Sequence, residues 1–242
     1  MINIVIPMAG QGSRFVNAGY KKPKPFIDVN GLPMIELVIK NLSIPNARYI
    51  LIARNNHIRA EPLIVNNLQK NYNVTFIGID KLTEGTACTV LFARSLINNN
   101  IPLLIANSDQ LIDCDINDFI NDANKRKLDG SILCFEEPNK DPKWSYAKLD
   151  KNNLVDKVKE KEPISINATV GIYYFNQGLF FTDNAVDMII NNDRVNNEFY
   201  TCPVYNYLIN SGYKIGVFNI DKIKMHGIGT PEDLNAYLKL IN

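Results

Sequence analysis

The stretch INIVIPMAGQGSRF, residues 2–15, begins with an apolar run, residues 2–7, which leads directly into a glycine-rich turn. Gly10 and Gly12 can adopt backbone angles that other residues avoid, so amide N–H groups there can approach an anion closely. Arg14 and, further along the chain, Lys24 add full positive charge. The Gly-Lys-Ser/Thr of a Walker loop is missing from this turn. The stretch therefore predicts a strand followed by a different kind of polyphosphate-binding turn.

Short apolar runs alternate with longer helical patterns along the chain, a rhythm typical of βαβ units. The runs are residues 2–7, 49–53, 74–79, 103–106 and 131–135. Two helices are predicted from apolar residues at helical spacing, one after Pro33 and one after the capping residues Thr230, Pro231 and Asp233. Their apolar positions are Ile35, Val38, Ile39 and Leu42, and then Leu234, Tyr237, Leu238 and Ile241. We predict a single α/β domain over residues 1–242, with a mixed, mostly parallel sheet flanked by helices.

The rhythm changes between Trp144 and Phe175. Runs at 146–149 and 154–158 are separated by the turn residues 150–153, and a further strand is expected at 170–175. This pattern predicts a hairpin plus one more strand. We expect a small β insertion, residues 144–175, that forms one wall of the active site.

The bulk composition limits the partners. Lysine and arginine total 26 against 25 aspartate and glutamate, so the formal charge of +1 provides no basic field for a nucleic-acid backbone. The 4 cysteines show no Cys-x-x-Cys pair, which argues against a zinc site or a disulfide framework and fits a reducing compartment. The N-terminus lacks a secretion signal, and no apolar run approaches the length of a membrane span. We expect a cytoplasmic protein with no membrane or nucleic-acid partner.

Five further motifs follow the turn. They are Gly31-Leu32-Pro33-Met34-Ile35, Glu84-Gly85-Thr86-Ala87, Asn107-Ser108-Asp109, Glu160-Lys161 and Gly229-Thr230-Pro231-Glu232-Asp233-Leu234. With the Gly-x-Gly-x-Arg turn and the later Pro-Lys, they make the chain resemble the sugar-phosphate nucleotidylyltransferases, and most of all the short cytidylyltransferases of capsule biosynthesis. The resemblance implies a single-domain, Rossmann-like fold of the GT-A type and a nucleotidyl-transfer activity.

The resemblance assigns the nucleotide-binding residues. It places Arg14 at the β- and γ-phosphates and Lys24 at the α-phosphate, so these two are the candidate catalytic residues. The remaining candidates for nucleotide binding are Ala9, Gly10, Gln11, Gly12, Ser13, Glu84, Gly85, Thr86 and Ser108. In the family the turn at Glu84 lies against the nucleobase, although Thr86 could simply cap a helix and Glu84 could be an ordinary exposed acid.

A magnesium site is expected at Asp109. This residue follows the apolar run 103–106, which places it at the carboxyl end of a strand, where open α/β sheets bind ligands. A hard carboxylate there suits Mg²⁺ bridging phosphate oxygens. The family's second aspartate ligand is replaced by Gly227. His226 could bind the ion, position a phosphate, or be packed and hydrogen-bonded in the core, and the packed role is favoured.

The acceptor side is also assigned through the resemblance. Lys161 is expected to bind the acceptor phosphate. Asn167, Thr169 and Gly171 match the strand beside the acceptor pocket, and Glu198 matches an acid that binds acceptor hydroxyls or amines. The aromatic residues Trp144, Tyr146 and Tyr173 could be core residues or could wall this pocket.

We predict that the chain transfers CMP from CTP to a small phosphorylated acceptor, such as phosphoglutamine or a similar capsule precursor, and releases pyrophosphate with the help of Mg²⁺. CTP is favoured because cytidylyltransferases predominate among family members of this length. A sugar 1-phosphate nucleotidylyltransferase that uses another triphosphate is the main alternative. A GT-A glycosyltransferase, suggested by Asp113-Cys114-Asp115, and a non-catalytic nucleotide-sensing module also stay open, as does a homodimer.

Overall fold

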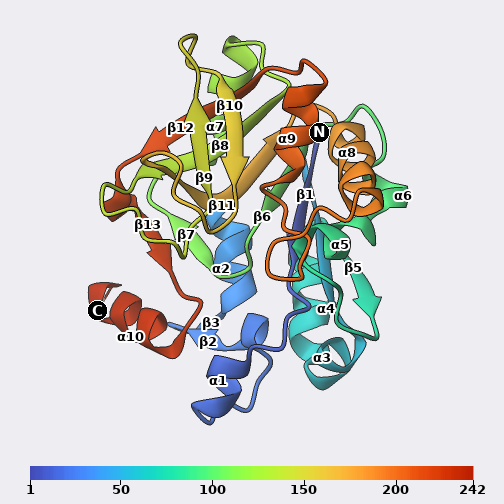
Figure 1. The fold of residues 1–242 in the computed structure, drawn as a ribbon. Coiled ribbons are helices and arrows are strands. Elements are labelled where there is room, and N and C mark those ends of the chain that lie inside the picture. Colours follow the sequence, from blue (N-terminus) through green and yellow to red (C-terminus); the bar gives the residue numbers. More distant parts are fainter. Residues whose placement is uncertain (242) are drawn as a thin grey trace.

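The computed structural model describes residues 1–241 and shows helices on both sides of one large sheet (Figure 1). The sheet has nine strands, and seven of them follow the order β10-β9-β11-β6-β1-β4-β5. Its parallel part consists of β6 (Leu103–Ala106), β1 (Ile2–Pro7), β4 (Ala47–Arg54) and β5 (Val74–Ile79). A mixed sheet flanked by helices is therefore confirmed.

The antiparallel part of the sheet is built on β11 (Asn167–Phe175), which pairs with β6 of the parallel part. The antiparallel pairing continues with β8 (Gly130–Glu136), β9 (Tyr146–Leu149) and β10 (Val155–Lys159), whereas β12 (Ile215–Ile220) pairs with β8 in parallel. The expected hairpin and strand are thus present. Within the sheet, β11 lies beside β6, and β9 and β10 extend the sheet beyond β11.

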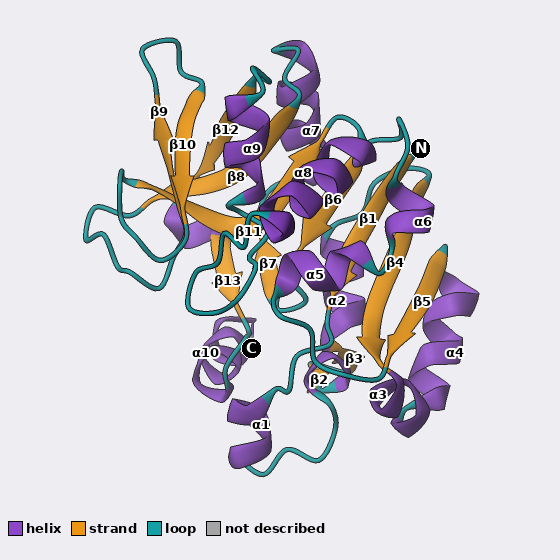
Figure 2. Ribbon diagram, turned by 45° about the vertical axis from the view of Figure 1, so that its right-hand side comes forward, coloured by secondary structure: helices purple, strands orange, loops and turns teal. Residues whose placement is uncertain are grey.

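Helices cover both faces of the sheet (Figure 2). One hydrophobic core holds the buried side chains of α2 (Met34–Asn41), α4 (Pro62–Asn71) and α7 (Ile116–Lys125). The other core holds those of α5 (Thr86–Leu91), α6 (Arg94–Ile97), α8 (Gly178–Ile190) and α9 (Val204–Asn210). The continuous apolar run of β1 follows from this arrangement, because Ile4 and Ile6 enter the first core and Val5 enters the second.

Short elements complete the chain around one end of the sheet. They are α1 (Ser13–Asn17), η1 (Lys24–Phe26), β2 (Asp28–Val29), β3 (Leu32–Pro33), α3 (Asn55–Ala60), β7 (Gln110–Ile112), η2 (Lys222–Lys224), β13 (Met225–Gly227) and α10 (Pro231–Ile241). No helix among residues 1–241 is long and apolar enough to cross a membrane.

The helix predictions are largely confirmed. Ile35, Val38 and Ile39 are buried in α2, and the Thr230 hydroxyl accepts the Asp233 N–H at 3.1 Å at the start of α10. Two details differ. Ile241 is exposed, so the packed face of α10 ends before it. The helix expected after Glu84 is broken into α5 and α6.

Candidate active site

The turn after β1 is shaped by Gly12. This residue has φ +62°, in the left-handed region, and immediately precedes α1. A Cβ there would lie 3.0 Å from the Cβ of Lys24. Glycine is therefore required both by the backbone angle and by the close approach of the segment that carries Lys24.

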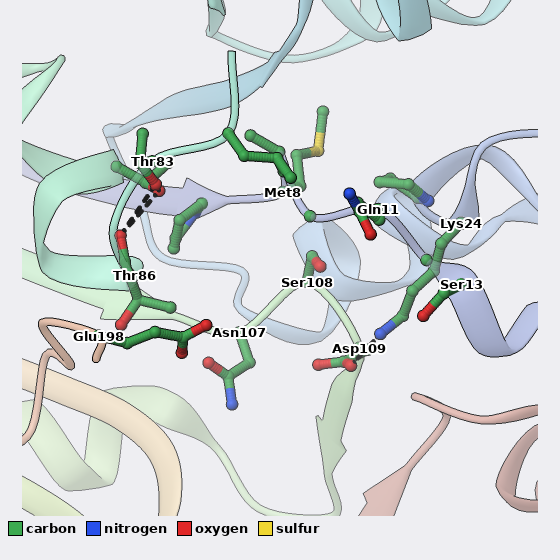
Figure 3. A pocket seen from close by; sticks show the side chains of 18 residues that line it. Met8, Gln11, Ser13, Lys24, Thr83, Thr86, Asn107, Ser108, Asp109 and Glu198 are labelled. Atoms are coloured by element: carbon green, nitrogen blue, oxygen red, sulfur yellow. Dashed lines mark hydrogen bonds and ion pairs between the residues drawn. The ribbon is translucent and has the colours of Figure 1, made fainter. Parts of the chain in front are cut away.

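The turn forms one wall of a cavity of about 530 Å³, the first cavity (Figure 3). Residues 9–13 line it together with Lys24, Ser108 and Asp109, so most of the predicted phosphate-binding residues are brought together. Lys24 is the one cation among the described lining residues. Arg14 is exposed and does not line the cavity, so of the two predicted catalytic residues Lys24 alone lies there.

Lys24 and Asp109 form an ion pair, with side chains 21% and 25% exposed. Figure 3 shows the two groups meeting at one end of the first cavity. Gly229 lies directly behind them, because a Cβ on it would be 2.6 Å from Asp109 Oδ2 and 3.6 Å from Lys24 Nζ. The sequence predicted separate roles for Lys24 and Asp109 and gave no sign of this contact.

The other end of the first cavity is lined by the turn before α5. Gly85 has φ +126°, and a Cβ on it would lie 2.4 Å from the Phe199 carbonyl oxygen. The Glu84 carboxylate pairs with Arg194, and Glu84 does not line the cavity. The Thr86 hydroxyl accepts the Thr201 N–H at 3.1 Å and caps no helix. Thr83 and Thr86 therefore line this end of the cavity, and the Glu84 side chain does not.

A second cavity of about 240 Å³ adjoins the first, and Pro7, Thr86 and Asn107 line both. Thr169 and Gly171, two of the residues predicted for the acceptor side, line it. The register of β11 against β8 shifts between Thr169 and Tyr173, and Gly171 in this bulge has φ +91°. A Cβ on Gly171 would lie 2.1 Å from Asn107 Nδ2, so the bulge makes room for Asn107 at the junction of the two cavities.

The second cavity has an acidic and aromatic lining. Trp144, Tyr173 and Tyr200 contribute aromatic walls, and Glu160, 8% exposed, contributes a carboxylate that accepts the Ser145 hydroxyl. Burial raises the pKa of Glu160, while the Ser145 hydrogen bond and the charge of Lys161 oppose the shift. In the sequence, Glu160 lies in a charged run that is typical of a solvent-exposed strand edge, so its burial could not be predicted. Tyr146 is fully buried, so its core role is confirmed.

Three predicted acceptor residues lie elsewhere. Lys161 does not line the second cavity and donates to the Tyr200 hydroxyl at 2.7 Å. Asn167 is bonded to the Ala147 carbonyl at 3.3 Å and to Asn219 at 3.2 Å. Glu198 lines the first cavity, and Figure 3 shows it near Thr86 and Asn107, where the two cavities meet.

His226 and the Asp113-Cys114-Asp115 motif have structural partners. His226 Nε2 lies 2.7 Å from Asp113 Oδ2, and its ring packs 5.6 Å from that of Tyr237. Asp115 caps α7 by accepting the Asn117 N–H at 2.9 Å. His226 thus makes the packing and hydrogen-bond contacts of the favoured role, and the two aspartates have local contacts away from the first cavity.

At the end of the first cavity where Lys24 lies, one protein carboxylate could bind magnesium. Asp109 supplies it, and Glu198, the other carboxylate among the described residues that line this cavity, lies near Thr86 and Asn107 instead. No group of three or more His, Cys, Asp or Glu that could hold a metal occurs within residues 1–241. This donor set fits an ion held by Asp109, phosphate oxygens and water, the kind of ligation that Mg²⁺ accepts.

Comparison with known proteins gives one family. A sequence profile described as "Nucleotidyl transferase" matches residues 4–235. The chain is 27% identical over 181 residues to the bifunctional protein GlmU of Methanococcus aeolicus, covering 74% of this chain and 41% of that protein. It is 28% identical over 258 residues to GlmU of Aquifex aeolicus, covering 95% and 51%. The chain thus spans about half the length of these relatives or less.

Solved structures share the fold. A nucleoside-diphosphate-sugar pyrophosphorylase of Vibrio cholerae superposes with a TM-score of 0.81 at 25% identity, covering 98% of this chain and 99% of that one. A Bacillus anthracis protein named as a glucose-1-phosphate thymidylyltransferase, solved with sucrose, gives 0.77 at 18% identity and covers 99% and 95%. The second likeness concerns the fold alone.

Proposed function

The chain belongs to the nucleotidyl transferase family, and from this premise we propose that it transfers a nucleoside monophosphate from a triphosphate to a small phosphorylated acceptor. The observation that carries the proposal is the pair of adjoining cavities. The first has a glycine turn and Lys24 for a triphosphate, and the second is a smaller space for the acceptor. Asn107 and Thr86, which line both, mark where the reacting groups would meet.

In the proposed reaction, an oxygen of the acceptor phosphate attacks the α-phosphorus. The bond from that phosphorus to the oxygen bridging the α- and β-phosphates breaks, and pyrophosphate leaves with the bonding electrons. A phosphate monoester is already ionised at neutral pH, so neither a protein nucleophile nor a strong base is needed, and catalysis consists of alignment and charge stabilisation. Lys24 and the amides of residues 10–13 provide fixed positive charge, and Asp109 orients the Lys24 ammonium. Magnesium, held by Asp109, would neutralise phosphate charge when bound.

The acceptor and the base are narrower proposals. The name of the Vibrio protein concerns nucleoside-diphosphate sugars, and this favours a sugar 1-phosphate as the acceptor. CTP with phosphoglutamine or a similar capsule precursor is the second candidate. Its support is the set of motifs at the start of the chain and the aromatic, acidic lining of the second cavity, which suits an acceptor with N–H groups.

Pyrophosphate release tests the proposal. The protein is mixed with Mg²⁺, each of the four nucleoside triphosphates, and glucose 1-phosphate, phosphocholine or phosphoglutamine. We expect release that requires both substrates and falls about 10²–10³-fold in Lys24→Ala, because a fixed charge on the transferring phosphate is lost. Lys22→Ala, which removes an exposed charge nearby, is the matched control and should leave turnover unchanged. Absence of release with every pair would overturn the proposal.

A further inference from the structure

The loop between β8 and β9, residues 137–145, is held firmly at both ends. The buried Glu137 carboxylate accepts the Lys222 ammonium at 2.6 Å and the Asn139 N–H at 3.1 Å. At the other end, the Asp141 carbonyl accepts the Tyr146 hydroxyl at 2.7 Å, and Asp141 Oδ1 accepts the Lys143 N–H at 3.0 Å. These contacts fix where the last residues of the loop lie.

The loop delivers three consecutive residues, Lys143, Trp144 and Ser145, to the second cavity. Among the described residues that line this cavity, Lys143 is the one cation and Glu160 is the one carboxylate. No sequence motif pointed to Lys143. The cavity therefore has a positive side that the sequence did not reveal.

The Lys143 ammonium is available for exchange with a ligand. It lies 4.9 Å from the centre of the Trp144 ring and 3.2 Å from Asp141 Oδ2, and its side chain is 64% exposed. Exposed ion pairs of this kind contribute little to stability, so an anion can replace the carboxylate with little loss. The indole keeps the ammonium close to the cavity through a cation–π contact.

Lys161, the lysine expected to bind the acceptor phosphate, contacts Tyr200 instead. Its ammonium donates to the Tyr200 hydroxyl at 2.7 Å and lies 4.7 Å from the centre of the same ring. Tyr200 lines the second cavity, but Lys161 does not. Lys143 is thus the better placed of the two lysines for direct contact with an anion in the cavity.

We propose that Lys143 binds the anionic group of the acceptor, a phosphate monoester, at the second cavity. The inference rests on the proposed function for the identity of the acceptor, and it assigns specificity for the acceptor charge to a residue outside the family motifs. A charge-assisted hydrogen bond from an ammonium to a phosphate oxygen is among the strong ones, so its loss is measurable.

The chain carries its own reporter for the test, because Trp144 is its single tryptophan. Its fluorescence is followed while the protein is titrated with glucose 1-phosphate, phosphocholine or inorganic phosphate, with glucose as the uncharged control. Lys143→Met keeps the packing of the stem on the indole and removes the charge. We expect it to weaken binding of the phosphate compounds by about tenfold or more, whereas Lys143→Arg stays within about threefold of wild type.

Lys148→Met is the matched control, because it removes an exposed lysine charge of β9 that does not line the cavity. It should bind all probes as the wild type does. The proposal is overturned if Lys143→Met binds as wild type, if both variants lose equal affinity, or if no phosphate compound changes the fluorescence. This binding test needs no turnover. Its failure alongside normal pyrophosphate release would reject only the role of Lys143, and binding without any release would reject only the proposed function.

Discussion

Single glycines leave the space that the charged groups of the first cavity occupy. Gly229 is the clearest case, since a Cβ there would overlap Asp109 and crowd the Lys24 ammonium. Gly227, two residues earlier, faces open space, and a Cβ there would meet no atom within 4 Å. The two glycines differ in their surroundings although only Ile228 separates them in the sequence. They therefore form a matched pair for testing whether the position of Asp109 matters.

Gly229→Ala should displace the Asp109 carboxylate from Lys24. A misplacement of about 1 Å in such a site can cost about 10²-fold, so we expect kcat/KM to fall by about 10–10²-fold. Gly227→Ala should stay within about twofold of wild type. Steady-state pyrophosphate release, with melting temperatures as a folding check, makes the comparison. Equal activity of the two variants would show that the Lys24–Asp109 contact plays no part in turnover.

Glu160 is the residue whose burial works against stability. Burial raises its pKa in the folded protein above that in the unfolded chain, so the folded state binds this proton more tightly. The resulting stabilisation is complete below the ordinary glutamate pKa of 4.5 and is lost as the pH rises through the higher folded value. Buried groups of this kind are typical of functional sites.

Glu160→Gln removes the buried charge and keeps an oxygen to accept the Ser145 hydroxyl. We expect the variant to be more stable than wild type at pH 8, and the difference to shrink as the pH falls to 5. Chemical denaturation at both pH values measures it. A stability difference that does not change with pH would contradict the assigned titration of Glu160.

At the scale of elements, the two aspartates of the Asp113-Cys114-Asp115 motif, which resembled a metal site, have structural contacts at the ends of a helix and a strand. Asp115 ends the loop after β7 and caps α7, and Asp113 pairs with His226 of β13. β13 pairs with β7, and the Ile228 N–H that follows it donates to the Asp109 carbonyl at 2.9 Å. The paired strands β7 and β13 therefore hold the segment with Gly229 against Asp109, and Asp113 contacts β13 through His226, whereas Asp115 caps α7.

Asp115→Ala should lower the melting temperature by about 2–4 °C through loss of the helix cap. Asp115→Asn keeps the cap and should melt as the wild type does. Neither change should alter the rate of pyrophosphate release. A loss of activity in the asparagine variant, with folding intact, would instead favour the metal-binding role that a glycosyltransferase requires.

At the scale of the whole molecule, the sequence predicted the features that depend on local pattern. The run at residues 2–7 coincides with β1, and the run at 103–106 coincides with β6. Apolar runs, helix caps and glycine turns each depend on a few neighbouring residues, so they can be predicted from a short stretch of sequence. The same holds for residues 9–13, whose place in the wall of the first cavity follows from one turn.

Contacts between distant segments could not be read in this way. Lys24 and Asp109 are 85 residues apart, and their pairing depends on the register of strands that the sequence does not specify. The central place of β11 depends on its antiparallel pairing with β6. The buried position of Glu160 depends on its contact with Ser145, 15 residues away, and Lys143 is brought to the second cavity by the 137–145 loop. Acceptor specificity is therefore the part of the site that sequence patterns describe least.

The central claim is that the turn at residues 10–13 and Lys24 hold a triphosphate beside Asp109. A crystal structure with Mg²⁺ and the nucleoside triphosphate that gives the fastest pyrophosphate release tests it most directly. We predict that the three phosphates follow the backbone of residues 10–13 in the first cavity, with the Lys24 ammonium on the α-phosphate. Phosphates bound outside that cavity, or a Lys24 side chain turned away from them, would contradict the account.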